Sequence, residues 1–223
     1  MSKHTKSKET LLEEIFAENL RDFDRIVSEK YGIVCGIDEA GRGPVAGDVY
    51  AAAVILDPNK PISGLNDSKK LSPKKREMLF DEIIEKAAAW CVGVATVAEI
   101  EETDILSADL LAMKRAFEGL KEKAEIVLVD GDVLPEIDCI ARNVISGDAK
   151  SEAIAAASIL AKVSRDRYMK RQAEIYPQYG FEKHAGYGTK VHYAAIDKYG
   201  ACPIHRQSFL KKHFAKKIAD ENR

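Results

Sequence analysis

The sequence predicts an α/β protein in which a mixed β-sheet is flanked by helices. Short apolar runs bounded by Gly and Pro alternate with segments of helical periodicity. The first two runs, 32–38 and 48–56, are separated by a tight Gly-rich turn, which indicates a hairpin, whereas helical segments separate the later runs. A chain of 223 residues that is 46% apolar can form one core without disulfides.

The N-terminal segment predicts an amphipathic helix over 10–27. Apolar residues recur there at helical spacing, and Thr10 with Glu13 matches a capping box. We expect residues 1–30 to form a helical arm that packs on a main domain, 31–223. No secretory h-region or membrane-spanning apolar run occurs in the sequence, which predicts a cytoplasmic protein with no membrane partner.

The middle of the chain alternates between helix and strand. A loop over 60–73 leads into a helix from Ser72, with Pro73 at its first position. The elements predicted next are a strand over 89–97, a helix over 107–123, a buried strand over 125–131 and a β-like stretch over 138–145.

The longest helical pattern is opened by Asp148 in "SGDAKSEAI" and stops at Pro177. Its run of Ala and Ser from Ala153 to Ala161 predicts a thin face that lies close to the sheet. The tail from Tyr179 onward alternates glycine loops with short helical pieces, which predicts a helical C-terminal region.

Four acidic residues stand at the ends of these elements. Asp38 and Glu39 follow an apolar run, Asp130 ends another, and Asp148 opens the long helix. Ligand sites in open α/β sheets gather at the rim where strands end. Clustered carboxylates repel one another unless divalent cations such as Mg²⁺ or Mn²⁺ bind them. Two such ions about 3.5–4 Å apart can activate a water and stabilise a leaving oxygen in phosphodiester hydrolysis.

Each acid also has a purely structural interpretation. Asp148 could cap the long helix, Asp130 could belong to a turn, and the first two acids could pair with lysines. Neighbours on a flat strand point to opposite faces, so Asp38 and Glu39 converge only if the strand ends or twists there. The following "GRG" allows such a twist, and the coincidence of four acids at three element ends favours the metal site.

The turn "GRGPVAG" (41–47) lacks the spacing of a dinucleotide-binding or Walker loop. It is either a plain hairpin turn or a bare backbone that approaches a ligand and reads it through N–H and C=O groups. Pro44 stiffens the loop, and Arg42 could reach a phosphate.

Five motifs resemble, in the right order, the bacterial ribonuclease HII family of type 2 ribonucleases H. They run from about Gly32 to Phe209 and are "DEAGRGP", "VDG", "GDAKSEAIAAASILAKVSRDR", "GYGT" and "HRQSF". The resemblance implies an RNase H-like catalytic domain that cleaves the RNA strand of RNA–DNA hybrids and incises 5′ to ribonucleotides embedded in duplex DNA. The sister type HIII enzymes have a larger N-terminal domain, which the short arm here does not match.

The resemblance also assigns site residues. The four catalytic, metal-binding acids correspond to Asp38, Glu39, Asp130 and Asp148. The substrate-binding positions are the loop that senses the ribose 2′-OH, a stacking tyrosine and lysines on the phosphate side, and they correspond to Gly41, Arg42, Gly43, Tyr187, Lys69 and Lys70.

The net charge of −2 conceals a strong asymmetry. Residues 99–138 carry −8, whereas 60–76 carry +5 and 183–217 carry +7. The two basic blocks are either solvated faces or parts of one phosphate-binding surface. The basic tail, which either solubilises the chain or adds salt-dependent affinity for nucleic acid, includes Lys211, Lys212, Lys216 and Lys217. We expect a monomer and leave open a sliding-clamp contact at the tail.

Two other functions fit parts of this pattern. A DNA junction resolvase would share the acids but would not need to read a 2′-OH. A non-catalytic hybrid-binding protein would use the basic tail, although acids near phosphate hinder binding unless metals are present. We assign no catalytic function to His184, His192 or His205, because a metal-activated water needs no histidine base.

Overall fold

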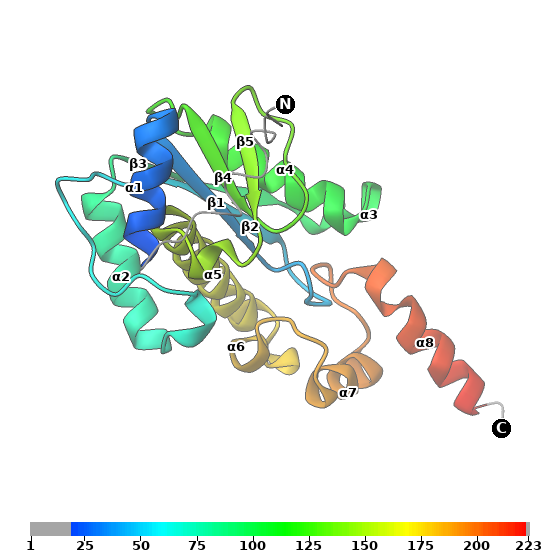
Figure 1. The fold of residues 1–223 in the computed structure, drawn as a ribbon. Coiled ribbons are helices and arrows are strands. Elements are labelled where there is room, and N and C mark those ends of the chain that lie inside the picture. Colours follow the sequence, from blue (N-terminus) through cyan, green and yellow to red (C-terminus); the bar gives the residue numbers. More distant parts are fainter. Residues whose placement is uncertain (1–18, 222–223) are drawn as a thin grey trace, which may run out of the picture.

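The computed structural model describes residues 19–221 and contains a five-stranded mixed sheet in the order β3-β2-β1-β4-β5 (Figure 1). The strands are β1 (Val34–Ala40), β2 (Val49–Ile55), β3 (Ala89–Ala95), β4 (Ile126–Asp130) and β5 (Ile140–Val144). β1, β2 and β3 pair antiparallel, and β4 and β5 add to the other side of β1 in parallel. The predicted mixed sheet, its opening hairpin and the fold class are confirmed.

Helices cover both faces of this sheet (Figure 1). The α-helices are α1 (Leu20–Tyr31), α2 (Pro73–Lys86), α3 (Val97–Glu102), α4 (Ile105–Glu118), α5 (Glu152–Ile175), α6 (Phe181–His184), α7 (Lys190–Tyr199) and α8 (Gln207–Glu221). Single 3₁₀ turns are η1 (Ser68–Lys70), η2 (Gly147–Ala149) and η3 (Pro177–Tyr179). Within the part of the chain that the structure describes, none of these helices has the length and apolarity to cross a membrane.

The core has two main layers. α4 packs on the face of the sheet that carries Ile37, and α5 with α2 packs on the opposite face, which carries Val54. The alanine-rich stretch of α5 is buried there, as predicted. Gly36 permits this close approach, since a Cβ at that position would lie 2.1 Å from the backbone carbon of Ala153.

Several element ends differ from the prediction. The strand expected over 89–97 ends at Ala95, because Thr96 and Glu99 form a capping box that starts α3. The helix expected over 107–123 begins at Ile105, where Asp104 caps it, and ends at Glu118. α1 continues to Tyr31, beyond the expected end, whereas the portion of the predicted helix before residue 19 lies outside the described residues.

The start of the long helix also differs. Asp148 lies in η2, and α5 begins only at Glu152. Ser151 is the N-cap, and its side chain accepts a hydrogen bond from the backbone N–H of Ile154. The interpretation of Asp148 as the helix cap is therefore wrong, and its carboxylate is available to the sheet rim.

Candidate active site

Three of the four predicted acids meet at the rim of the sheet. Asp38 comes from β1, Asp130 from the end of β4 and Asp148 from η2, and each offers a carboxylate oxygen within 4.8 Å of the others. The backbone N–H of Gly147 donates to Asp130 Oδ1 at 2.6 Å, which ties η2 to the end of β4. Parallel pairing of β1 with β4 thus brings together residues that are about 90 positions apart in the chain.

The cluster is electrostatically strained without a cation. Burial raises the pKa of Asp38 well above its usual range, and the nearby Glu39 and Asp130 raise it further. Burial and then Asp130 also raise the pKa of Asp148. Carboxylate oxygens that converge in this way are the donor set that Mg²⁺ and Mn²⁺ prefer, so the residues fit a divalent metal site.

Glu39 does not join this group. β1 continues through Ala40, so Glu39 points to the α4 face while Asp38 points toward α5. There its carboxylate lies 3.5 Å from Nη1 of Arg42, whose Nε lies 3.3 Å from Oδ2 of Asp109. Asp109 is buried on α4, and burial followed by Glu39 raises its pKa to about 8.

The two predicted lysines sit differently in η1. Burial alone would lower the pKa of Lys69, but the surrounding acids, Asp148 and Asp38 first among them, together outweigh it and the pKa rises. Its ammonium group therefore lies in the field of the acid cluster. Lys70 is exposed, and its Nζ lies 3.9 Å from Asp67. Asp67 also adds to the raised pKa of Asp148, so a further acid, not predicted from the sequence, borders the cluster.

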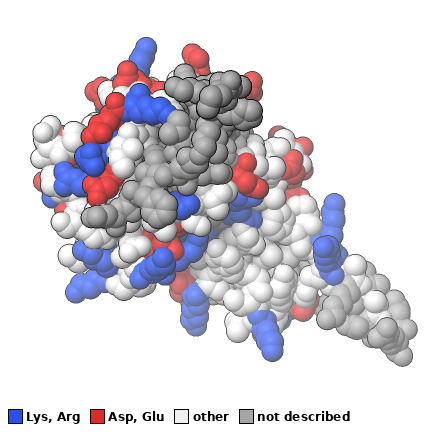
Figure 2. Space-filling view, in the orientation of Figure 1, with Lys and Arg blue, Asp and Glu red and all other residues white. Residues whose placement is uncertain are grey.

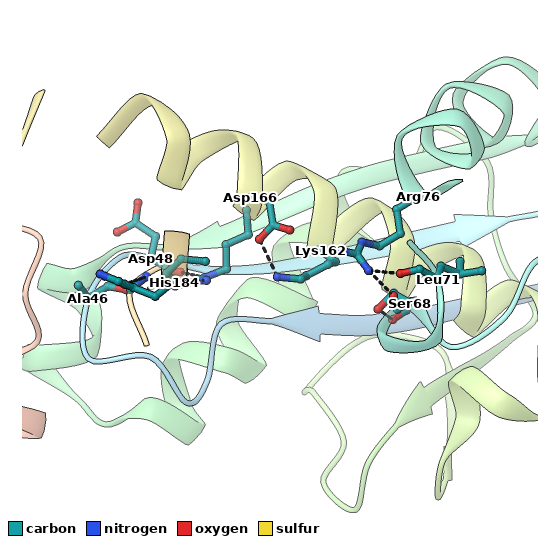
Figure 3. Close-up of polar contacts among 12 residues, drawn as sticks. Ala46, Asp48, Ser68, Leu71, Arg76, Lys162, Asp166 and His184 are labelled. Carbon is teal, nitrogen blue, oxygen red and sulfur yellow. Dashed lines mark hydrogen bonds and ion pairs between the residues drawn. The ribbon is translucent and has the colours of Figure 1, made fainter. Parts of the chain in front are cut away.

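A buried pair of hydroxyl groups and the half-buried guanidinium of Arg76 hold η1 in place. Ser68 Oγ lies 2.8 Å from Oγ of Ser158 on α5, and Ser158 also hydrogen-bonds Asp38. Arg76 donates to the carbonyls of Ser68 and Leu71 at 2.7 and 2.6 Å (Figure 3). These contacts fix Lys69 beside the acids.

The glycine turn and Tyr187 lie against each other. Tyr187 is about half exposed, and a Cβ built on Gly43 would meet its ring at 3.5 Å. The backbone N–H of Val45 donates to the carbonyl of Gly186 at 3.0 Å, which joins the two loops. The structure therefore brings Gly41–Gly43, Arg42 and Tyr187 to one edge of the rim, next to the strand that carries Asp38 and Glu39.

A buried histidine pair supports the loop of Tyr187. His192 Nδ1 lies 2.9 Å from the carbonyl oxygen of Tyr187, so this nitrogen carries the proton, and its Nε2 lies 3.0 Å from Nε2 of His205. His205 Nδ1 accepts the backbone N–H of Cys202 at 2.9 Å. Burial is the main cause that lowers the pKa of both imidazoles to about 4. The pair serves as neutral scaffolding and does not touch the acid cluster.

The sequence did not predict three buried residues of this site, namely Arg165, Arg206 and Asp109. Arg165 and Arg206 are fully buried and donate to carbonyls of the glycine turn. Both lie in the quoted family motifs, but their bonds go to backbone carbonyls, which leave no pattern in the sequence. Asp109 gave no signal either, because one acid in the amphipathic pattern of a helix reads as a solvated position.

A family model described as "Ribonuclease HII" matches residues 35–217. Among curated proteins, ribonuclease HII of Caldicellulosiruptor bescii is 54% identical over 188 residues, which cover 84% of this chain and 91% of that protein. The acid cluster, the glycine turn and Tyr187 all lie within the matched range.

Two solved structures share the fold at 27–30% identity. The crystal structure of ribonuclease H2 from Pyrococcus horikoshii OT3 matches with a TM-score of 0.67 and 30% identity, over 78% of this chain and 92% of that chain. The RNase HII in the PCNA:RNase HII complex from Archaeoglobus fulgidus matches with a TM-score of 0.64 and 27% identity, over 78% and 93%.

Proposed function

Because this chain belongs to the ribonuclease HII family and is a ribonuclease H, we propose that it is a metal-dependent endonuclease. In this proposal it cleaves the RNA strand of RNA–DNA hybrids and incises 5′ to ribonucleotides embedded in duplex DNA. One observation carries the proposal. Carboxylates from β1, β4 and η2 meet at a rim that is bordered by the glycine turn and Tyr187.

Asp38, Asp130 and Asp148 would hold the metal, Mg²⁺ or Mn²⁺. Glu39, on the other face of β1, would add negative charge beside Asp38 and so strengthen the attraction for a cation. Bound divalent ions would activate a water and stabilise the leaving oxygen, which gives a 5′-phosphate and a 3′-hydroxyl. The cluster suits this task because its acids carry raised pKa values and gain from a cation.

The remaining residues of the rim would bind and orient the substrate. Lys69, fixed beside the acids, would neutralise a phosphate that approaches them, and Lys70 would add affinity from the exposed side of η1. The bare backbone of Gly41 and Gly43, with Arg42 between them, would contact the ribose 2′-OH. The half-exposed ring of Tyr187 would offer a flat surface to the next sugar or base.

The decisive experiment uses a labelled DNA duplex that contains one ribonucleotide and a matched all-DNA duplex. We expect incision 5′ to the ribonucleotide with Mg²⁺ or Mn²⁺, none with EDTA, and an intact DNA control. Cleavage of both duplexes would favour a junction-resolving nuclease and refute ribose recognition. Binding without turnover in any metal would instead favour a non-catalytic hybrid-binding protein.

A carboxylate exchange tests the acid cluster. Asp38→Asn should lower kcat by roughly a hundredfold or more, since it removes a ligand that stabilises transition-state charge. Asp81→Asn is the matched control, because this acid on α2 is exposed and forms a long ion pair, of 3.8 Å, with Arg167. Near wild-type cleavage by Asp38→Asn would contradict the assigned site.

The RNase HII of Archaeoglobus fulgidus was solved in a complex with PCNA. On this likeness we extend the proposal to a sliding-clamp contact at the C-terminal end of the chain. Co-elution of the full chain with a clamp from the same organism, lost on deletion of residues 216–223, would support it. Co-elution that survives the deletion would place the contact elsewhere.

A further inference from the structure

The carbonyl groups of the glycine turn are almost all turned inward. In the segment 41–48, each carbonyl except that of Gly43 accepts a hydrogen bond from Arg165 or Arg206. The acceptors are the carbonyls of Gly41, Arg42, Pro44, Val45, Ala46, Gly47 and Asp48. Such complete use of one loop's acceptors by two residues is a specific arrangement, because most buried carbonyls bond to backbone N–H groups.

Arg206 makes most of these bonds. Its guanidinium is fully buried just ahead of α8 and donates to Gly41 at 2.6 Å, Arg42 at 3.0 Å and Pro44 at 2.8 Å. It also donates twice to Gly47, at 2.9 and 2.6 Å, and its own backbone N–H donates to Val45. The planar fork of an arginine suits this task, since it presents five N–H groups in fixed directions.

Arg165 links the turn to the loop that carries Tyr187. From α5 it donates to the carbonyls of Asp48 and Ala46, each at 3.1 Å, and to that of Ala185 at 3.0 Å. The two loops that border the rim are thus held by one side chain on a rigid helix.

Whereas nearly all carbonyl groups of the turn have hydrogen-bond partners, not all of its N–H groups have one in the described part of the chain. Those of Val45 and Gly47 donate to carbonyls of neighbouring segments, at Gly186 and Ile204. For Arg42 and Gly43, however, no acceptor is present among residues 19–221. The tip of the turn therefore offers donors to a ligand, with the Gly43 carbonyl as its one acceptor without a bond to the arginine pair.

The positive charges of Arg165 and Arg206 beneath the turn also favour a ligand that accepts hydrogen bonds. Both guanidinium groups are buried, and burial followed by the proximity of Arg165 lowers the pKa of Arg206 to about 9, which leaves it protonated at neutral pH. Asp48 is the acid beside them. Two cations under the loop favour a ligand that brings oxygen acceptors or negative charge.

We propose that Arg165 and Arg206 are positioning residues for ribose selectivity: they turn the carbonyls of the glycine turn inward, so that Arg42 and Gly43 present N–H donors to the 2′-oxygen of a ribonucleotide. A deoxyribose has no oxygen at this position and leaves those donors unpaired. The inference rests on the proposed function and adds residues that do not themselves contact the substrate.

Arg206→Lys tests the inference. Lysine keeps the positive charge, but its three N–H groups cannot reproduce five guanidinium bonds in a fixed plane. We expect KM for the single-ribonucleotide duplex to rise about tenfold, the effect of one lost hydrogen bond, with kcat and the Mg²⁺ concentration for half-maximal rate within about twofold of wild type. A merely structural residue would instead lower kcat and thermal stability together.

Arg115→Lys is the matched control. Arg115 also donates to a backbone carbonyl, that of Val94, and pairs with Glu99, but it lies on α4 away from the turn. This variant should keep the wild-type KM. If Arg206→Lys does not fold, Arg165→Lys takes its place, because it disturbs only three carbonyl bonds.

A measurement on the wild-type chain needs no substitution. Hydrogen exchange of the amides of Arg42 and Gly43 should slow at least about tenfold more with the ribonucleotide duplex than with the all-DNA duplex. Equal protection by both duplexes, or an unchanged KM in a folded arginine variant, would overturn the inference. If wild type cuts neither duplex, the proposed function itself fails, which is a distinguishable result.

Discussion

At the residue scale, the two glycines of the turn meet different demands. Gly43 has no positive φ, and a Cβ there would touch only the ring of Tyr187, at an ordinary contact distance of 3.5 Å. The fold therefore tolerates a side chain at this position. We expect Gly43→Ala to keep the wild-type melting temperature and to lower kcat/KM on the single-ribonucleotide duplex about tenfold, because the methyl group blocks a close backbone approach.

Gly41→Ala is the informative counterpart. Its φ of +109° is a region that alanine rarely adopts, and a Cβ would lie 2.2 Å from Nε of Arg165. We expect a loss of about 1–3 kcal/mol in the free energy of unfolding, measured by chemical denaturation. If Gly43→Ala lost as much stability as Gly41→Ala, the distinction between a glycine that the fold requires and one that it does not would be wrong.

The same scale shows how far the site could be predicted from the sequence. Asp38, Asp130 and Asp148 were predictable because acids at the ends of buried elements gather at one rim. The geometry of Glu39 was not, since it depends on whether β1 stops or continues, and the strand runs one residue past it. The contacts of Arg206 with the glycine turn could not be predicted, because its side chain bonds to backbone carbonyls, which leave no pattern in the sequence.

At the element scale, the start of α5 decides where Asp148 lies. Ser151 is fully buried and caps the helix through Ile154 N–H, which leaves Asp148 outside the helix, in η2. Ser151→Ala should lower the free energy of unfolding by about 0.5–2 kcal/mol, read from urea denaturation. Ser72→Ala, the cap of α2, is the control, and its loss should be at the lower end of this range because that site is more exposed.

Element interiors were more predictable than element ends. The core of α2 and its Pro73 start agree with the sequence pattern, because Ser72 and Pro73 carry a clear start signal. α3 was missed, since its six residues are too few to show a helical period and its capping box follows a strand directly. The residues at which helices begin and end are thus set by capping residues, and hydrophobic periodicity alone does not predict them.

The buried histidine pair of the C-terminal region should make the free energy of unfolding depend on pH. His192 and His205 have pKa values near 4 in the fold against 6.5 for the free side chain, so the unfolded chain takes up protons between these values. Stability from this pair is therefore full above pH 6.5 and is lost as the pH falls toward 4. The raised pKa values of Asp109 and of the acid cluster act in the opposite sense over this range, so the pair is isolated by comparison. Relative to His205→Gln, wild type should lose stability as the pH falls, as measured by denaturation at each pH.

His213→Gln is the control for that series. His213 lies on α8 and pairs with Asp197 at 3.0 Å, outside the buried pair. It should retain the wild-type dependence between pH 6.5 and 4. A fall of the same size in His205→Gln as in wild type would show that other groups cause it.

At the scale of the whole molecule, residues from both basic blocks border the acid rim or the glycine turn beside it. The block 60–76 reaches it through Lys69, and the block 183–217 reaches it through Tyr187 and Arg206. Lys and Arg side chains also project along the lower edge of the face in Figure 2 and over α8. Because Arg206 is buried, a single nucleic-acid surface would also require the exposed lysines of α8 to reach the substrate.

Salt dependence tests that surface. Each phosphate contact made by a lysine adds close to one unit to the slope of log K against log salt concentration. Lys211 and Lys212 are exposed on α8, so replacing both with alanine should reduce the slope by up to about 2 if both contact phosphates, with kcat unchanged. Removal of Lys121 and Lys123, two exposed lysines within the acidic stretch, is the matched control and should leave the slope as it is. Equal slopes in all three proteins would mean that α8 only solubilises the chain, and that the substrate is held by the rim alone.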